Sequence, residues 1–214
     1  MYFVESAAMA CYLGDHARLV TDKAAVVCAE TGATLSYREL DDRSNRLAQY
    51  LHGLGLRRGE RIAVILENNI RFFEIAWATL RSGLLLTTVN RHLTADGAAF
   101  IVNDCDARLV ISSSAVGELA HGIAGQLTRC PHRLSMDGDL DGWGSYEQAL
   151  ATSTAEPLAE EWLGGAMLYS SGTTGRPKGV VRELPMRKVW EGLEPIRAAM
   201  ISRFGWRATP STCL

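Results

Sequence analysis

The sequence has few of the features that mark specialised protein classes. It contains 22 Lys and Arg against 24 Asp and Glu, a formal net charge of −2, and no run of basic residues. This balance argues against nucleic acid or an anionic membrane as the main partner. No apolar stretch approaches the length of a membrane-spanning helix, and the first residues lack the basic start of a secretory signal. The sequence therefore predicts a cytoplasmic protein with no transmembrane segment.

Cysteine and histidine form no recognisable framework. The five cysteines are odd in number and have no metal-ligand spacing: Cys11, Cys28, Cys105, Cys130 and Cys213. They favour reduced, mostly buried thiols over disulfides, and we predict no metal site. The histidines lie on separate predicted helices or loops: His16, His52, His92, His121 and His132. We interpret each histidine as a surface or packing residue and not as a catalytic one.

Apolar runs and helical stripes alternate along the first 126 of the 214 residues. Short apolar runs predict strands at 24–29, 61–66, 84–89 and 108–111, and a shorter one near 34–35. Helical patterns lie at 36–54, 70–80, 94–103 and 115–126, and a short one at 146–150. This alternation predicts an α/β fold with a doubly wound, mostly parallel sheet and helices on both faces.

Two of the predicted helices carry distinct signals. Ser36 begins the first of them, and Glu39 three residues later completes a capping box. The second has an apolar stripe that we expect to face the core, formed by Ile70, Phe73, Trp77 and Leu80. Between residues 130 and 165 the pattern weakens and turns dominate.

The most informative stretch runs from Met167 to Arg182. Apolar residues lead into a loop of glycines and small hydroxyl residues, and β-branched residues leave it, so we predict strand–loop–strand. The glycines permit positive φ, which lets successive backbone N–H groups converge on an anion. Ser170, Ser171, Thr173 and Thr174 add hydroxyl donors, and Lys178 adds a mobile positive charge. These are the requirements for holding a polyphosphate.

Two other interpretations of the stretch compete with this one. Any four of its residues alone are equally typical of a polar hairpin loop with one exposed lysine. A Walker-type phosphate loop is excluded because Pro177 stands where that loop needs glycine, and Gly179 replaces the Ser or Thr after the lysine.

The whole string resembles the signature phosphate loop of the adenylate-forming (AMP-binding) superfamily, most closely that of acyl-CoA synthetases. The match is continuous over Ser170-Ser171-Gly172-Thr173-Thr174-Gly175-Arg176-Pro177-Lys178-Gly179. Three earlier blocks are similar to family elements in order and spacing: 34–40, 59–90 and 93–104. Taken singly each block is an ordinary core element, but together the resemblance covers about residues 20–205.

The resemblance implies an ATP-dependent carboxylate–CoA ligase of fatty acid metabolism. In this family a carboxylate attacks the α-phosphorus of Mg-ATP to give an acyl-adenylate, and the thiol of coenzyme A then displaces AMP. It implies that phosphate binding falls to Ser170, Ser171, Gly172, Thr173, Thr174, Gly175 and Lys178. These residues bind the leaving pyrophosphate; none is a nucleophile or general base, and the catalytic residues stay unknown. Mg²⁺ is implied as a cofactor, although the family's magnesium-binding glutamate has no counterpart here.

The sequence also departs from the family. Many members carry a hydroxyl residue and a histidine where this chain has Glu183 and Leu184, which leaves the acyl-side contacts open. Relatives are more than twice as long, and the acyl pocket, the adenine site and the mobile C-terminal domain lie downstream in them. We therefore expect residues 1–207 to form a partial N-terminal AMP-binding domain.

The tail at 208–214 does not resemble the family. Read in the neighbouring phase its codons fit a typical family continuation, so we interpret the tail as the product of a frameshift or sequencing error. Three interpretations of the chain stay open: part of an acyl-CoA synthetase, a non-catalytic remnant that binds nucleotide weakly or fails to fold, or part of another adenylate-forming enzyme such as an amino-acid adenylation domain. By itself the chain is expected to be inactive.

Overall fold

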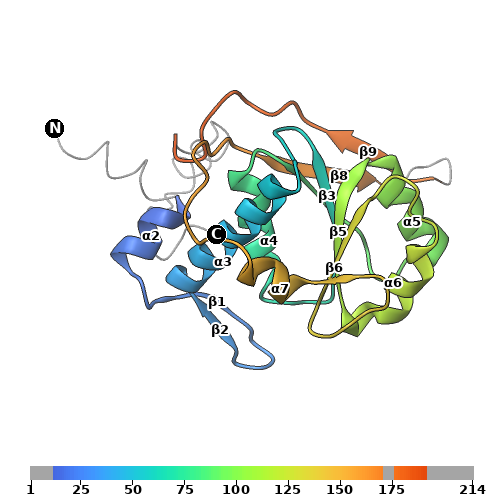
Figure 1. Ribbon diagram of the computed structural model, residues 1–214, viewed down its shortest axis with the longest axis horizontal. Coiled ribbons are helices and arrows are strands. Elements are labelled where there is room, and N and C mark those ends of the chain that lie inside the picture. Colours follow the sequence, from blue (N-terminus) through green and yellow to red (C-terminus); the bar gives the residue numbers. More distant parts are fainter. Residues whose placement is uncertain (1–11, 171–175, 192–214) are drawn as a thin grey trace.

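A seven-stranded sheet forms the centre of the computed structural model, which describes residues 12–170 and 176–191 (Figure 1). Its strands are β3 (Arg61–Ile65), β4 (Leu85–Thr88), β5 (Ala107–Ser113), β6 (His132–Met136), β7 (Gly144–Ser145), β8 (Gly165–Ser170) and β9 (Lys178–Val181). The spatial order is β7-β6-β5-β3-β4-β8-β9. Every neighbouring pair is parallel except β8 and β9, which are antiparallel. The predicted doubly wound, mostly parallel sheet is confirmed.

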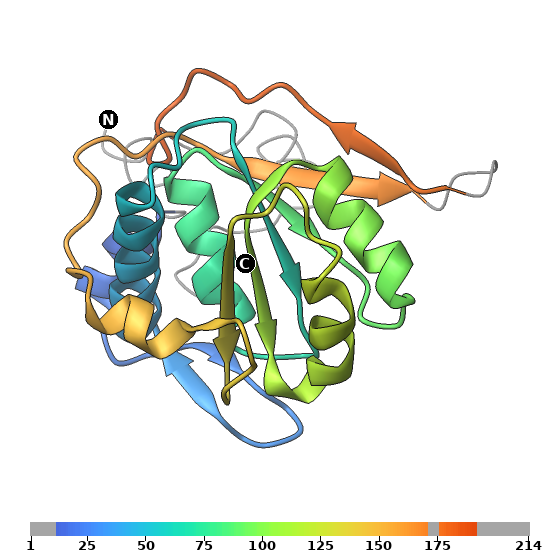
Figure 2. The same ribbon diagram turned by 45° about the vertical axis from the view of Figure 1, so that its right-hand side comes forward.

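Helices cover both faces of this sheet, as Figures 1 and 2 show. The helices on the sheet are α3 (Tyr37–Gly53), α4 (Phe72–Arg81), α5 (Ala95–Asp104), the 3₁₀ turn η1 (Ser114–Val116), α6 (Gly117–Ala124) and α7 (Tyr146–Ala151), whereas α2 (Leu13–Leu19) packs on α3. Side chains of α3, α4 and α7 form one apolar cluster with the sheet, and those of α5 and α6 form another. A separate antiparallel hairpin consists of β1 (Ala24–Val27) and β2 (Thr34–Ser36).

The central strand β3 shows why an uninterrupted apolar run is needed. Ile62 and Val64 belong to the cluster with α3 and α4, whereas Ala63 and Ile65 belong to the cluster with α5 and α6. Successive side chains of a strand point to opposite faces, so a strand covered on both faces must be apolar at every position. All four side chains are at most 2% exposed.

Helix α3 begins where the sequence predicts. The Glu39 carboxylate accepts a hydrogen bond from the Ser36 backbone N–H at 2.8 Å, and the Glu39 N–H donates to Ser36 Oγ at 3.2 Å. This reciprocal pair is the predicted capping box, and it satisfies two donors that the helix start leaves free. The predicted apolar face of the helix is buried at Leu40, Leu47 and Leu51.

The predicted apolar stripe packs largely on a buried cluster, because Ile70, Phe73 and Trp77 contact the apolar residues of α2, α3 and the β1–β2 hairpin. The stripe residues are only partly buried: Ile70, Phe73, Trp77 and Leu80. Two charged side chains on α4 are instead fully buried, Glu74 at 1% and Arg81 at 0% exposure. Arg43 donates to Glu74 at 2.6 Å, and Arg81 donates to Asp41 at 2.7 Å. These two buried charges were not predicted because charge usually marks a surface position, and partners on α3 make burial possible here.

Strands β6 and β7 were not predicted. The start of β6 is polar and only partly buried at His132 and Arg133, and β7 has two exposed residues. Strand β7 is the edge strand, and it pairs with β6 only at Leu134 and Ser135, so the start of β6 has no neighbour on that side. An edge position removes the demand for continuous apolar residues, so the sequence lacks the pattern of a buried strand.

Two further predictions concern the ends and location of the chain. The tail at 208–214 lies outside the described residues, so its boundary stays a prediction. Within residues 12–170 and 176–191, no helix combines the length and the hydropathy that crossing a bilayer requires. The cytoplasmic location stays a prediction as well.

Gly164 fixes the place where β8 meets β4, which gives a first prediction. A Cβ atom on Gly164 would lie 2.4 Å from the carbonyl oxygen of Leu84 and 2.7 Å from that of Thr79. Backbone cannot yield as a flexible side chain does, so we expect Gly164→Ala to lower the free energy of unfolding by about 3 kcal/mol. The measurement is urea unfolding followed by circular dichroism.

Gly53 provides the matched control. It ends α3, and a Cβ there would have no atom within 4 Å. Gly53→Ala should therefore change the same free energy by less than about 1 kcal/mol, and in the stabilising direction. Equal effects of the two substitutions would show that the close approach at Gly164 does not matter to the fold.

Candidate functional site

The predicted loop joins β8 to β9 at the carboxyl end of β8. Ser170 lies opposite Lys178, and Tyr169 lies opposite Gly179, in an antiparallel ladder. This confirms the predicted strand–loop–strand arrangement. Because β8 runs parallel to β4, the loop leaves from a carboxyl end of the parallel sheet. Ligands of open α/β sheets bind outside the carboxyl ends of the strands.

Only part of the predicted phosphate loop belongs to the described residues. Ser170 is the last residue of β8 and Lys178 the first of β9, so the two are paired neighbours. The other predicted residues lie outside the described residues: Ser171, Gly172, Thr173, Thr174 and Gly175. Their assignment to phosphate binding stays a prediction.

Lys178 is exposed, and its ammonium group is available to an anion. Within the described part of the chain, no carboxylate or carbonyl accepts a hydrogen bond from it, whereas Lys188 donates to Glu160 at 2.9 Å and lies 3.6 Å from the ring centre of Trp162. The nearest polar contact is made by Ser170, whose hydroxyl lies 3.5 Å from the Lys178 carbonyl oxygen. A long contact of this kind is weak, so the hydroxyl can turn to a ligand at little cost.

The hairpin face that carries these two residues is apolar further along. Leu168 lies opposite Val180, two positions from the pair of Ser170 and Lys178, and side chains two apart share a face. Leu168 is 60% exposed and Val180 is 52% exposed. One open face thus combines a hydroxyl, a free cation and a short apolar row.

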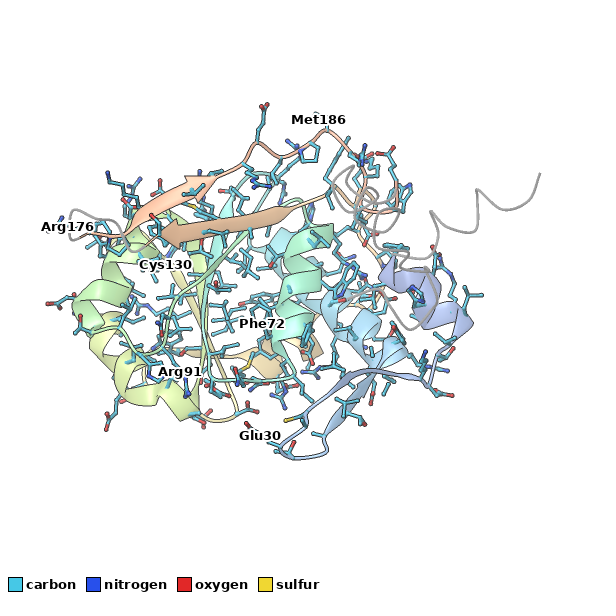
Figure 3. All side chains as sticks on the ribbon, turned by 180° about the vertical axis from the view of Figure 1, so that it is seen from behind. Glu30, Phe72, Arg91, Cys130, Arg176 and Met186 are labelled. Carbon is cyan, nitrogen blue, oxygen red and sulfur yellow. The ribbon has the colours of Figure 1, made fainter. Side chains whose placement is uncertain are left out.

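The opposite face of the hairpin packs on α5. Tyr169 donates a hydrogen bond from its hydroxyl to Asp104 Oδ2 at 2.5 Å. Burial and this hydrogen bond raise the pKa of Tyr169 well above its usual value, so the hydroxyl stays a protonated donor. Just beyond the loop, the Arg176 guanidinium lies 5.4 Å from the ring centre of Phe100, which is also on α5; Figure 3 labels Arg176 at the end of the hairpin.

The individual roles of Tyr169, Asp104, Arg176 and Phe100 were not predicted from the sequence. Phe100 and Asp104 are four positions apart, which places them on one face of α5. That spacing, together with the tyrosine immediately before the loop, could have indicated that this face of α5 contacts the flanks of the loop. Their partners Tyr169 and Arg176 could not be identified, because the pairs are 65 or more residues apart in the sequence.

Gly179 is required by the side chains that cross it. A Cβ atom there would lie 2.5 Å from Cε of Met167 and 3.2 Å from the ring of Tyr169. Any larger residue would push the tyrosine away from Asp104. The glycine after Lys178 therefore has a packing role in addition to its place in the motif.

A second hollow, of about 540 Å³, lies between the turn of the β1–β2 hairpin and the carboxyl ends of β3 and β4. Figure 3 labels two of its lining residues, Glu30 and Phe72. Its walls are largely apolar, and Glu67 is one of its few charged residues. Sequence analysis did not single it out. It is lined by none of the predicted phosphate-binding residues that the structure describes.

Glu67 is held in the charged form. Burial raises the pKa of this carboxyl, but hydrogen bonds from the Ser113 hydroxyl and from Asn69 Nδ2 outweigh burial and leave the pKa below its usual value. The Asn69 bond measures 2.8 Å. Asn69 Nδ2 also donates to Asp137 at 2.9 Å, so the amide bridges two carboxylates.

Metal-binding side chains do not gather in the described part of the chain. No group of three or more His, Cys, Asp or Glu residues there could hold a metal ion. The described cysteines are free, and two of them, Cys105 and Cys130, are buried. His16 is buried against the ring of Tyr37, with ring centres 5.1 Å apart, in keeping with its predicted packing role.

Sequence comparison connects this site to a known family. The profile of the family described as "AMP-binding enzyme" matches residues 13–185. A long-chain-fatty-acid–CoA ligase of Thermus thermophilus is 32% identical over 147 residues, which cover 68% of this chain and 27% of the ligase. A crotonobetaine/carnitine–CoA ligase of Escherichia fergusonii is 29% identical over 188 residues, covering 78% of this chain and 36% of the ligase.

Structural comparison gives the same fold. The crystal structure of the anthranilate–CoA ligase AuaEII in complex with anthranoyl-AMP superposes with a TM-score of 0.68 at 23% identity. The match covers 78% of this chain and 33% of the ligase chain. The chain thus spans about a third of the length of the relatives it matches.

The charged state of Glu67 gives a prediction about pH. A glutamate carboxyl with a lowered pKa stabilises the fold above its unfolded pKa of about 4.3, and this contribution is lost as pH falls through the lower folded pKa. Glu67→Gln should cost about 0.5–1 kcal/mol at pH 7, since partial exposure weakens the interaction. The difference between wild type and variant should shrink from pH 7 to pH 3 in urea unfolding.

Glu183 serves as the control for this measurement. It is exposed, and no hydrogen bond or ion pair joins it to another described residue. Glu183→Gln should leave stability unchanged at both pH values. A Glu67→Gln difference that is constant with pH would contradict the lowered pKa.

Proposed function

Because the chain belongs to the family of AMP-binding enzymes, we propose that it supplies the phosphate-binding loop of an ATP-dependent carboxylate–CoA ligase. The observation that carries the proposal is the pairing of Ser170 with Lys178 where the loop leaves the sheet, together with the lack of any partner for the Lys178 ammonium among the described residues. The hydroxyl and the ammonium lie on one exposed face, next to the stretch that carries the predicted glycines. ATP, a carboxylic acid and coenzyme A are the proposed substrates.

The chemistry explains why a cation is needed here. ATP supplies the α-phosphorus that a carboxylate attacks to form an acyl-adenylate, and both reactants are anionic. Lys178 and the loop donors reduce this repulsion by binding the β- and γ-phosphates, and they stabilise pyrophosphate as it leaves. Ser170 and Lys178 act by binding and orientation, and neither is assigned as nucleophile or general base.

Magnesium has no site among the described residues that would hold it without the nucleotide. Protein-bound Mg²⁺ is usually held by one or two carboxylates together with substrate phosphates. We therefore propose Mg²⁺ as the companion of ATP on family grounds and assign no residue of this chain to it.

The relatives support a CoA ligase over an amino-acid adenylation domain, because the two curated relatives above are both named as CoA ligases. Their names differ in the acid, a long-chain fatty acid in one and crotonobetaine or carnitine in the other. Sequence similarity thus supports the class of reaction and does not identify the carboxylic acid substrate. We retain the proposed division into a partial AMP-binding domain at 1–207 and an atypical tail at 208–214.

A second candidate function is nucleotide binding without turnover. It is favoured by the groups that the described residues supply, since Ser170 and Lys178 are assigned to binding and no described residue is assigned as a nucleophile, acid or base. The assays below separate the two candidates.

Lys178 provides the direct test. We expect Lys178→Met to weaken binding of pyrophosphate and of ATP with Mg²⁺ at least about tenfold, because a charge-assisted hydrogen bond to phosphate is lost. Lys178→Arg should retain more affinity than Lys178→Met because the charge is kept. The measurement is isothermal titration calorimetry on the whole 214-residue chain.

Lys188→Met is the matched control, since its ammonium already has Glu160 and Trp162 as partners. It should leave affinity unchanged. Exchange of labelled pyrophosphate into ATP that depends on the acid and on Lys178 supports the ligase, whereas binding without exchange supports the second candidate. Absence of both binding and exchange in the wild-type chain would contradict both functions.

A further inference from the structure

Helix α5 contacts both flanks of the predicted phosphate loop. On the incoming side, Tyr169 donates to Asp104 at 2.5 Å. On the outgoing side, the Arg176 guanidinium lies over the ring of Phe100 at 5.4 Å. Both contacts fall on one face of α5, one helical turn apart. Figure 3 shows the hairpin end with Arg176 beside this helix.

The tyrosine contact is specific in direction and charge. The Tyr169 ring packs on the apolar cluster between the sheet and α5, so its hydroxyl is the part of the side chain that forms a hydrogen bond. Asp104 ends α5 and accepts this hydrogen bond from the strand residue that precedes Ser170. Hydrogen bonds to a charged acceptor are stronger than neutral ones. Tyr169 therefore has a single preferred position, and the backbone of Ser170 is positioned with it.

The arginine contact restrains the other flank. Arg176 is the first described residue after the loop and stands two positions before Lys178. A guanidinium over an aromatic face is attracted by the ring quadrupole, modestly at an exposed site. Gly179 completes the arrangement, because its lack of a side chain lets Met167 and Tyr169 cross the hairpin.

We propose that Tyr169 and Asp104 are positioning residues for the phosphate loop, with Phe100 and Arg176 as a weaker second tether. This inference rests on the proposed function, since it concerns the same loop. The pair of tethers holds the two ends of the loop at a fixed separation and orientation. Ser170 and Lys178 held in this way lose less conformational freedom when they bind a polyphosphate, and affinity rises accordingly.

The exposure of the pair makes this role separable from stability. Asp104 is exposed, so an unpaired carboxylate or hydroxyl there can be solvated by water when its partner is removed. Loss of the hydrogen bond should therefore change the position of Ser170 more than it changes the free energy of unfolding. A purely structural pair would show the opposite behaviour.

The test is a double-mutant cycle in the full chain, with Tyr169→Phe, Asp104→Asn and the double variant. We expect each single variant to weaken pyrophosphate binding about fivefold, and the double variant to be no weaker than the worse single variant. Hydrogen exchange at the amides of residues 171–175, followed by mass spectrometry, should accelerate in all three variants. Tyr50→Phe and Asp141→Asn are controls at positions with no hydrogen bond to another described side chain.

The outcomes distinguish this inference from the proposed function. Additive effects in the cycle, or unchanged exchange at residues 171–175, would overturn the positioning role even if the wild-type chain binds pyrophosphate. A wild-type chain that binds neither pyrophosphate nor ATP refutes the proposed function, and accelerated exchange in the variants would still support the tether. Equal losses of affinity and unfolding free energy would assign the pair to stability alone.

Discussion

The parallel pairing of β8 with β4 is the constraint on which the candidate site depends. Three register pairs join the strands, and Gly164 brings the incoming chain against the backbone at Leu84 and Thr79. No side chain larger than hydrogen fits at that approach. The pairing therefore fixes the direction in which β8 leaves the sheet and, with it, the place from which the loop begins. The position of the proposed phosphate site therefore depends on the pairing of β8 with β4.

The two faces of the β8–β9 hairpin differ: one packs on the rest of the protein, and the other is open to solvent and carries the proposed phosphate-binding side chains. Met167 and Tyr169 point to α5 and the buried cluster, whereas Ser170 and Lys178 stand on the open side. Alternation along a strand makes this division unavoidable, because neighbouring residues cannot share a face. A loop built on such a hairpin can be held firmly from behind while its donors stay accessible. Lys188 has Glu160 as a partner, whereas Lys178, on the open face, has none among residues 12–170 and 176–191.

Local patterns could be predicted from the sequence, and contacts between distant segments could not. The capping box of Ser36 and Glu39 is a short-range signal, and the structure contains it. The apolar runs of the central strands likewise report a sheet covered on both faces. The buried charges of α4 were missed because their partners come from another helix. The contact of Asp104 with Tyr169 was missed for the same reason. The loop itself was recognisable as a motif, although five of its residues lie outside the described chain.

The distance along the sequence between Asp104 and Tyr169 has a consequence for folding. The two residues are 65 positions apart, so their contact forms only after a long segment has been closed into a loop. During synthesis, β4 and α5 leave the ribosome well before β8, and β8 then joins an edge that is already present. The hairpin that carries the proposed phosphate site is in this sense the last part of the described sheet to be assembled. A nascent chain can hold a nearly complete parallel core while it is still unable to bind phosphate.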